Sequence, residues 1–190
     1  MRKLIVTNIV SLDGYFEGSG GNVMALPMDG AFDAYNAERL RAADTLLLGR
    51  RTFEMFQGFW PAVADNPAFG PVQQEISRLD NAIDKLVVSD SLGLEPTGAW
   101  TDTTEVIARA KAHAHIADLK RGDGGDILVF GSHTLWNDLL AADLVDELHL
   151  IIGAIALGGG TPAFTTANSL RLTGTRTFDG SDNHLAQFAK

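Results

Sequence analysis

Short apolar runs of strand length alternate with longer stretches of helical periodicity along most of this 190-residue chain. The apolar runs expected to form strands are 3–10, 45–48, 85–89, 126–130 and 147–152. Helical patterns lie between several of them, at 29–43, 103–120 and 134–142. Strands that alternate with helices favour a parallel sheet covered on both faces, because each parallel connection must cross over the sheet. The pattern therefore predicts an α/β fold.

The end of the chain has a different pattern. Two strand candidates, 170–178 and 184–189, follow one another with no helix between them, which predicts an antiparallel pair that completes the sheet. The stretch 59–70 contains two prolines and ends on a glycine, so it is expected to be a loop. No repeat, low-complexity tract or linker interrupts the chain, and we expect a single domain over 1–190.

Composition excludes several classes of protein. A net charge of −9 argues against a nucleic-acid surface, although it leaves room for a local anion site. The absence of cysteine excludes a disulfide scaffold and a thiol nucleophile. The N-terminal apolar run is short and has no small-residue cleavage site, and no stretch reaches the ~20 apolar residues of a membrane helix. We therefore expect a cytoplasmic protein with no membrane partner.

The residues that follow the strands carry the chemical signal, because ligands of such sheets bind beyond the carboxyl ends of the strands. The sequence GSHT at 131–134 lies where a strand gives way to a helix, whose free N–H groups suit a phosphate. Ser132 or Thr134 is expected to cap this helix. The alternative is a simple strand-to-helix turn with a hydroxyl cap. His133 lies at the same place and is a further candidate contact.

The sequence GRRT at 49–52 has the same position after another strand, with positive charge added. Arg50 and Arg51 can clamp a phosphate as bidentate donors, or lie in solvent, or pair with Glu54. The sequence SDS at 89–91 can hold a phosphate or form a serine turn. Taken together, these segments indicate a dinucleotide site, although no G-x-G-x-x-G follows the first strand.

Candidates for proton chemistry are Asp13, Asp29 and Asp33. Asp29 precedes a helix and is expected to be its N-cap, with a proton relay near a bound ring as the alternative. Asp13 lies in a Leu-Asp-Gly turn and is either a turn residue or a substrate contact. His113 and His115 lie two apart on an expected helix and point to different faces, so no shared metal site is predicted.

Four segments in order, LPMD, LLLGRRT, LVVS and ILVFGSHTLW, resemble the sequential motifs of the dihydrofolate reductase superfamily. The block 131–164 is similar to the branch that contains the C-terminal reductase domain of the riboflavin-biosynthesis deaminase-reductase. The resemblance implies a three-layer α/β/α sandwich around a mostly parallel sheet with an antiparallel C-terminal strand. It also implies NADPH as cofactor, a small-molecule substrate and a homodimer.

The resemblance assigns individual positions. The phosphate contacts it implies are Gly49, Arg50 and Thr52, then Ser89 near the adenosine 2′-phosphate, and Gly131, Ser132, Thr134 and Leu135 at the pyrophosphate. It implies that Asp29 is the active-site carboxylate and that Asp13 lies beside the substrate and nicotinamide. Arg51 has no counterpart in the motif and is expected to face solvent or an ion-pair partner.

Two departures separate the chain from folate reductases. Where those enzymes have an arginine before the third strand, residues 81–85 read NAIDK, and Ile151 stands where they have a threonine. The main hypothesis is an NADPH-dependent reductase of a pteridine-, pyrimidine- or flavin-precursor-like heterocycle. The alternatives are a non-catalytic ligand-binding protein and a reductase with a flavin-type cofactor. The apolar stretch 150–157 exceeds the needs of one strand, which favours a dimer interface.

Overall fold

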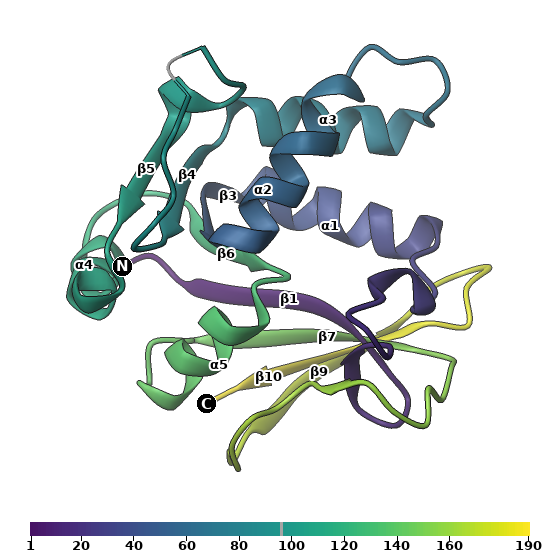
Figure 1. Cartoon of the computed structure of the whole chain (residues 1–190). Coiled ribbons are helices and arrows are strands. Elements are labelled where there is room, and N and C mark those ends of the chain that lie inside the picture. Colours follow the sequence, from purple (N-terminus) through teal and green to yellow (C-terminus); the bar gives the residue numbers. More distant parts are fainter. Residues whose placement is uncertain (96) are drawn as a thin grey trace.

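One eight-stranded sheet forms the centre of the computed structural model, which describes residues 1–95 and 97–190 (Figure 1). The strand order is β5-β4-β3-β6-β1-β7-β10-β9. The bounds of these strands are Leu4–Ser11 (β1), Ala43–Gly49 (β3), Asp84–Val88 (β4), Thr104–Ile107 (β5), Asp126–Phe130 (β6), Glu147–Gly153 (β7), Arg171–Thr177 (β9) and His184–Ala189 (β10).

One strand of this sheet runs opposite to all the others. The strands from β5 to β7 pair in parallel, with Val6 opposite Val129 of β6 on one side and Leu148 of β7 on the other. The last strand, β10, is antiparallel to both of its neighbours, β7 and β9. The predicted fold class, with the antiparallel pair at the end, is confirmed. β6 and β10 have the predicted bounds, and the other predicted strands are each within two residues of theirs.

Helices cover both faces of the sheet and complete three layers. On one face lie α1 (Gly30–Ala42), α2 (Arg50–Phe59) and α3 (Pro71–Ala82), and on the other lie α4 (Arg109–Arg121) and α5 (His133–Ala141). Short 3₁₀ turns occupy Val23–Ala25, Trp60–Ala62 and Thr101–Thr103.

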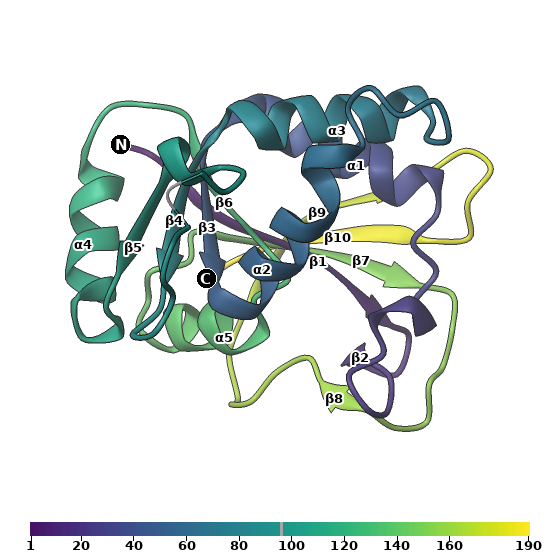
Figure 2. The same cartoon turned by 45° about the horizontal axis from the view of Figure 1, so that its top comes forward.

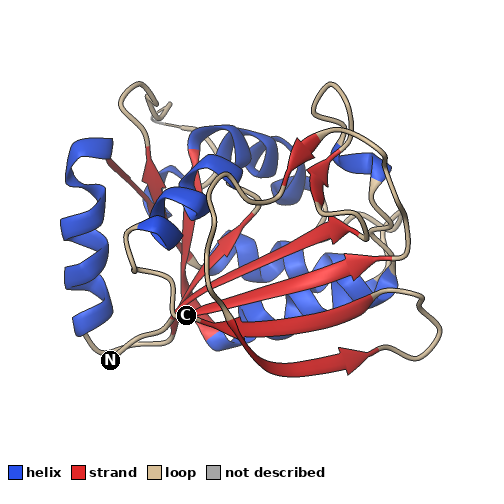
Figure 3. Ribbon diagram, turned by 90° about the horizontal axis from the view of Figure 1, so that it is seen from below, coloured by secondary structure: helices blue, strands red, loops and turns tan. Residues whose placement is uncertain are grey.

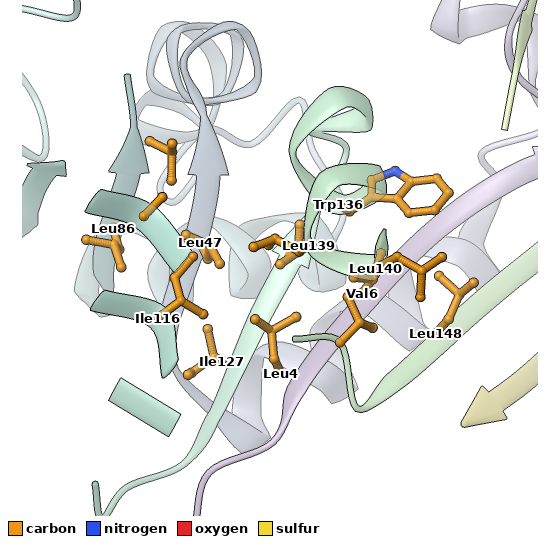
Figure 4. Packing of buried hydrophobic residues seen from close by; sticks show 14 of the residues in the cluster. Leu4, Val6, Leu47, Leu86, Ile116, Ile127, Trp136, Leu139, Leu140 and Leu148 are labelled. Carbon is orange, nitrogen blue, oxygen red and sulfur yellow. The ribbon is translucent and has the colours of Figure 1, made fainter. Parts of the chain in front are cut away.

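Alternate residues of each central strand bury into different layers. Leu4 and Val6 of β1 pack under Trp136 and Leu140 of α5, as the close view shows (Figure 4). Ile5 belongs instead to the cluster beneath α1, α2 and α3. Central strands are buried on both sides, and for this reason their sequences read as continuous apolar runs.

The expected helix at 103–120 is partly wrong. Its first part is β5, and α4 begins only at Arg109. Val106 packs into one layer and Ile107 into the other, an alternation that a strand provides and one helix face cannot. The buried residues of α4 are Ala112 and Ile116.

The expected loop at 59–70 is close to the structure, since only its start is helical, at the end of α2 and in the turn Trp60–Ala62. The pattern of apolar residues did not reveal α2 or α3. In α3 another signal is nevertheless present: Gly70 is followed by a proline, and Gln73 reaches back to the Gly70 N–H.

A small second sheet stands beside the main one. It pairs β2 (Tyr15–Glu17) with β8 (Thr161–Pro162), and both are visible at the edge of the molecule in Figure 2. The chain from 154 to 166, which we call the arm, connects β7 to this sheet and then crosses in front of the strands (Figure 3). The arm thus joins the ends of β1 and β7 to the start of α5.

Apolar side chains at the end of the stretch 150–157 pack within the chain itself. Ile155 and Leu157 of the arm pack against a buried cluster that contains Leu26 and Ile151. Because both side chains are only half-buried, the expectation of a dimer interface at this stretch stays a prediction. In the described part of the chain, no helix has the length and apolar character needed to span a membrane.

Candidate functional site

The carboxyl ends of β3 and β6 meet at one point. The backbone N–H of Gly49, which ends β3, donates to the Ser132 hydroxyl at 3.0 Å. The N–H of Ser132 in turn donates to the Thr52 hydroxyl at 2.8 Å. Each hydroxyl accepts one of these bonds and keeps its own hydrogen to donate elsewhere. The fold therefore brings together two segments that lie some eighty positions apart in the sequence. One segment contains Gly49 and Thr52, and the other contains Gly131 and Ser132.

The helices α2 and α5 begin at this point, and no acidic side chain in their first turns neutralises the partial positive charge of either N-terminus. Gly49 is the N-cap of α2 and Ser132 that of α5, and neither helix has an acidic residue in its first turn or a side-chain cap. By contrast, α1 has Asp29 as its cap and Asp33 in its first turn. Helix N-termini carry a partial positive charge and unpaired N–H groups. Two uncompensated N-termini side by side form a site for an anion.

Glycine is needed at position 131 for two reasons. Its φ is +51°, in the left-handed region. A Cβ there would lie 3.0 Å from Cγ2 and 3.1 Å from Oγ1 of Thr52, closer than such atoms normally approach. Gly131 therefore permits the close contact between the strand end and α2 that holds the site together.

Arg50 bridges α2 and the turn after β4. Its Nε donates to Glu54 at 2.7 Å, and one terminal nitrogen donates to the Ser91 hydroxyl at 2.9 Å. Arg51 is exposed and has no ion pair among the described residues. The pairing with Glu54 that the sequence allowed for either arginine thus belongs to Arg50. Its guanidinium, half exposed, lies between the start of α2 and the serine turn.

Ser89 is buried and shapes that turn. Its hydroxyl accepts from the N–H of Ser91 at 3.2 Å and of Leu92 at 3.0 Å. Ser89 thus forms the serine turn, and Ser91 is the residue that contacts Arg50.

The start of α5 differs from expectation in its capping. Neither Ser132 nor Thr134 caps the helix with its side chain, because Ser132 turns to Gly49 and Thr134 is exposed. Leu135, in the same first turn, lies against Gly49, with its Cβ 3.9 Å from the position a Gly49 Cβ would take.

His133 faces the arm. Its Nε2 lies 2.8 Å from the Pro162 oxygen and 3.0 Å from the Ala163 oxygen, so this nitrogen carries a proton. Asn137 donates to the same Ala163 oxygen at 3.0 Å and accepts from the Thr165 N–H at 2.9 Å. Sequence reasoning did not identify Asn137, and its spacing of four from His133 on a helix was the available signal.

Asp13 fastens the other end of the arm. Its carboxylate accepts from the Ser11 hydroxyl at 2.7 Å and from the N–H groups of Leu157 at 3.0 Å and Gly158 at 2.7 Å. The Ser11 bond, then the two backbone bonds, lower the pKa of Asp13 to about 2. Asp13 is therefore ionised at neutral pH and cannot act as a proton donor there.

Asp29 caps α1, as the sequence predicted. One carboxylate oxygen accepts from the N–H of Ala31 at 3.1 Å and of Phe32 at 3.0 Å. The other accepts from the Ser181 hydroxyl at 2.5 Å, in the turn between β9 and β10. Burial raises the pKa of Asp29, but the bonds from Ser181, Phe32 and Ala31 outweigh it and the pKa is lowered. Asp29 is thus also ionised, and both of its carboxylate oxygens accept hydrogen bonds.

A hollow of about 600 Å³ lies beside Asp29, between α1 and the β9–β10 turn. Its lining includes Ala34, Arg176, Phe178 and Ser181. It lies apart from the meeting of α2 and α5, and none of the residues at the Gly49–Ser132 contact line it. For a ligand that needs fixed donors, the helix starts offer the better chemistry, because Arg176 is already paired with Glu38 at 2.7 Å.

Comparison with known proteins gives a consistent result. A family model described as the RibD C-terminal domain matches residues 2–184. The uncharacterized protein YyaP of Bacillus subtilis (strain 168) is 29% identical over 180 residues, which cover 93% of this chain and 89% of that protein.

Solved structures share the fold. A putative riboflavin biosynthesis protein from Shewanella sp. PV-4 superposes with a TM-score of 0.68 at 24% identity, covering 98% of both chains. A dihydrofolate reductase from Enterococcus faecalis, complexed with NADP(H), superposes with a TM-score of 0.62 at 15% identity, covering 98% of this chain and 95% of that one. The three-layer architecture is therefore that of dihydrofolate-reductase-like proteins.

Proposed function

The chain belongs to the family of the RibD C-terminal domain, and from this premise we propose that it is an NADPH-dependent reductase of a pyrimidine- or pteridine-like heterocycle. The observation that carries the proposal is the meeting of two uncapped helix N-termini, those of α2 and α5, at the Gly49–Ser132 contact. An acidic chain that leaves two such termini without a carboxylate has a ready place for the phosphates of a dinucleotide.

The residues at this place fit such a cofactor. The free N–H groups at the start of α5, around Thr134 and Leu135, would hold a pyrophosphate, and Gly131 would let the backbone approach it closely. The hydroxyls of Ser132 and Thr52 keep hydrogens to donate. Arg50, held by Ser91, would bind a further phosphate, such as one on the adenosine ribose, beside the turn that Ser89 shapes.

When bound, a reduced nicotinamide dinucleotide supplies the hydride. The protein's part is to orient the acceptor and exclude water. Asp29 and Asp13 contribute to that positioning: Asp29 joins α1 to the β9–β10 turn, and Asp13 joins the loop after β1 to the arm. Because both are ionised and each already accepts three hydrogen bonds, they act as fixed acceptors of the site rather than as sources of a proton.

Folate itself does not fit this site as it fits a folate reductase. Ile151 is fully buried in a cluster with Leu26 and Leu185, so it offers no polar group to a ring. Lys85 is also buried and donates to the Thr103 hydroxyl at 3.0 Å, so it cannot grip a carboxylate tail. These contacts favour a smaller heterocycle, in keeping with the Shewanella protein described as a putative riboflavin biosynthesis protein.

The experiment that tests the proposal is a binding screen on the intact chain. NADPH, NADH, FMN and ATP are each added, and the thermal midpoint and the quenching of protein fluorescence are measured. NADPH is expected to raise the midpoint more than the others. A response to FMN alone, or yellow colour in purified protein, would identify a flavin-type cofactor instead. NADPH binding without NADPH oxidation across a panel of aminopyrimidines and pterins would indicate a binding protein. We also propose a homodimer, which sedimentation velocity tests directly.

A further inference from the structure

Lys85 of β4 is a buried lysine that the proposed reaction does not use. It is 2% exposed, and its Nζ donates one hydrogen bond, to the Thr103 hydroxyl at 3.0 Å. No carboxylate of the described residues lies within 4.0 Å of this nitrogen. Instead, Nζ lies 4.5 Å from the centre of the Trp100 ring, which is a cation–π contact. The charge of Lys85 is therefore applied to Trp100.

Asp80 of α3 supplies the balancing charge. It is 1% exposed, and its Oδ1 has no hydrogen-bond partner in the described part of the chain. Burial raises the pKa of Asp80 to about 7, and the attraction of Lys85 opposes that rise. Burial likewise lowers the pKa of Lys85 to about 8, against the attraction of Asp80 and then of Asp84. Each of the two buried groups thus keeps its charge chiefly through the other.

The remaining charged groups near Lys85 line a hollow of about 460 Å³ at the amino ends of β3, β4 and β5. These groups are Arg2, Asp44, Asp84, Asp102, Glu105 and His115. Arg2 is paired with Asp44, and Asp84 acts on Lys85 less than Asp80 does. The hollow brings solvent next to the buried pair, so a proton can leave Lys85 and return.

Trp100 is a strained anchor of the connection between β4 and β5. Its φ is +67°, in the left-handed region that a large side chain rarely adopts. Its indole N–H donates to Asn81 at 2.6 Å, and its carbonyl accepts from the hydroxyls of Thr103 at 3.2 Å and Thr104 at 2.7 Å. Because the Thr103 hydroxyl accepts from Lys85, its own hydrogen is directed at the Trp100 carbonyl. Lys85 therefore holds both the ring and the backbone of Trp100.

The connection that carries Trp100 also contacts α2. Ser91, near its start, accepts from Arg50 at 2.9 Å. The backbone oxygen of Ala99, beside Trp100, accepts from the Gln57 amide at 2.6 Å. The connection is thus attached to the first turn of α2 and again near the end of that helix.

Trp100 itself packs on α2 close to the candidate site. Its ring centre lies 6.2 Å from that of Phe53, which is fully buried. Phe53 follows Thr52, whose hydroxyl accepts the N–H of Ser132 at 2.8 Å. The placement of Trp100 is therefore transmitted through one side chain to the contact that joins the starts of α2 and α5.

We propose that Lys85 is a pH-sensitive positioning residue, whose ammonium holds Trp100 against α2 while Asp80 balances its charge. We call these three side chains the Trp100 clamp. When the ammonium loses its proton, its attraction to the ring disappears, and Asp80 becomes a buried charge without a counter-ion. Trp100 then leaves its left-handed conformation, and the connection loosens from α2. Only the consequence for NADPH rests on the proposed function.

Fluorine NMR of protein labelled with 5-fluorotryptophan tests the clamp. The chain has three tryptophans, and the resonances of the other two are assigned through Trp60→Phe and Trp136→Phe. Between pH 5 and 10, the Trp100 resonance is expected to move with a midpoint near 8, the pKa of Lys85. The Trp60 and Trp136 resonances should not share that midpoint. In ¹H–¹⁵N spectra, the hydrogen-bonded amides of Phe53 and Ser132 should follow it.

Variants distinguish the clamp from a general effect of pH. Asp80→Asn removes the charge that favours the ammonium, so the Trp100 midpoint should fall by about half a pH unit or more. Asp84→Asn, exposed on the same strand as Lys85, is the matched control and should shift the midpoint less. Lys85→Met alone leaves Asp80 unbalanced and is expected to lower stability. The double variant with Asp80→Asn and Lys85→Met should fold and should show no Trp100 movement near pH 8.

The effect on the cofactor is measured as NADPH affinity, by fluorescence, at pH 7 and pH 9. The wild-type protein is expected to bind NADPH about threefold or more weakly at pH 9, and the double variant should show a smaller change. Constant affinity in the wild-type protein while Trp100 moves would refute the role of the clamp in binding.

Three further results would overturn the inference. They are a wild-type Trp100 resonance that does not move near pH 8, the same movement in the double variant, and Phe53 and Ser132 amides that stay fixed while Trp100 moves. A protein in which Trp100 and both amides move as expected, but which binds no NADPH at any pH, would refute the proposed cofactor and confirm the clamp.

Discussion

The Thr52 hydroxyl on α2 accepts a hydrogen bond from the backbone N–H of Ser132, at the start of α5, at 2.8 Å. This bond joins two helices that lie on opposite faces of the sheet and begin at adjacent strands. It fixes the separation of their N-termini, and with it the spacing of the N–H groups that an anion would meet. The site is thus formed by a contact between the two layers rather than by one loop.

Replacing Gly131 tests this contact. Gly131→Ala is expected to lower the free energy of unfolding by about 1–2 kcal/mol or more, because alanine is strained at a φ of +51° and its Cβ would press on Thr52. NADPH binding should fall with it. Chemical denaturation and fluorescence titration measure the two effects. Gly58→Ala, in α2 with open space around the added Cβ, is the matched control and should be neutral or stabilising.

The two neighbouring arginines should differ in their effect on cofactor binding. Arg50→Ala is expected to weaken NADPH binding about tenfold or more, since it removes a charge held beside Ser91 at the helix start. Arg51→Ala should change binding by no more than about twofold, because an exposed charge is well screened. Fluorescence titration at fixed ionic strength gives both constants. Equal losses in the two variants would contradict the assignment of the phosphate contact to Arg50 alone.

Asp13 should make the protein sensitive to acid. Its pKa is lowered to about 2 in the folded state, below the value of 3.8 expected when unfolded. The stabilisation is therefore fully present above pH 3.8 and is lost as the pH falls toward 2. Denaturation midpoints of the wild-type protein and of Asp13→Asn are compared between pH 5 and 2. At pH 5 the variant should be less stable than the wild-type protein, and it should lose less stability as the pH falls to 2. Parallel curves for the two proteins would contradict the role of Asp13 in holding the arm.

His149 should destabilise the fold on mild acidification. It is buried in β7, with Nδ1 2.8 Å from the Tyr35 hydroxyl and Nε2 2.9 Å from Glu147. Burial lowers its pKa against the opposing effect of Glu147, so the folded protein favours the neutral ring. Because the unfolded chain binds the proton more readily, stability declines as the pH falls below about 6.5.

The measurement for His149 is the unfolding free energy at pH values from 8 to 5, with the imidazole resonances followed by NMR. His149→Gln should be less stable than the wild-type protein at pH 8 and should lack the decline that begins near pH 6.5. A His149 ring that titrates at or above the ordinary histidine value would contradict a pKa lowered by burial.

Local interactions account for what could be predicted from the sequence. The continuous apolar runs at β1, β3 and β6 indicated strands buried on both faces, and Asp29 was identified as a helix cap because its partners are two and three residues away. The prediction of one helix over 103–120 was partly wrong because it also rested on local pattern alone. Over four residues, the pattern of Thr104–Ile107 fits both a strand and a helix turn. Only pairing with β4 selects the strand.

The sequence by itself determined the α/β class, the order of most elements and the residues that would end at the carboxyl edge of the sheet. Only the tertiary structure decided which partners those residues have. Arg50 meets Ser91 forty-one positions away, and Asp13 meets Gly158 across 145 positions. Such partners depend on strand order and on which layer each helix joins, which are global results of burying both sheet faces.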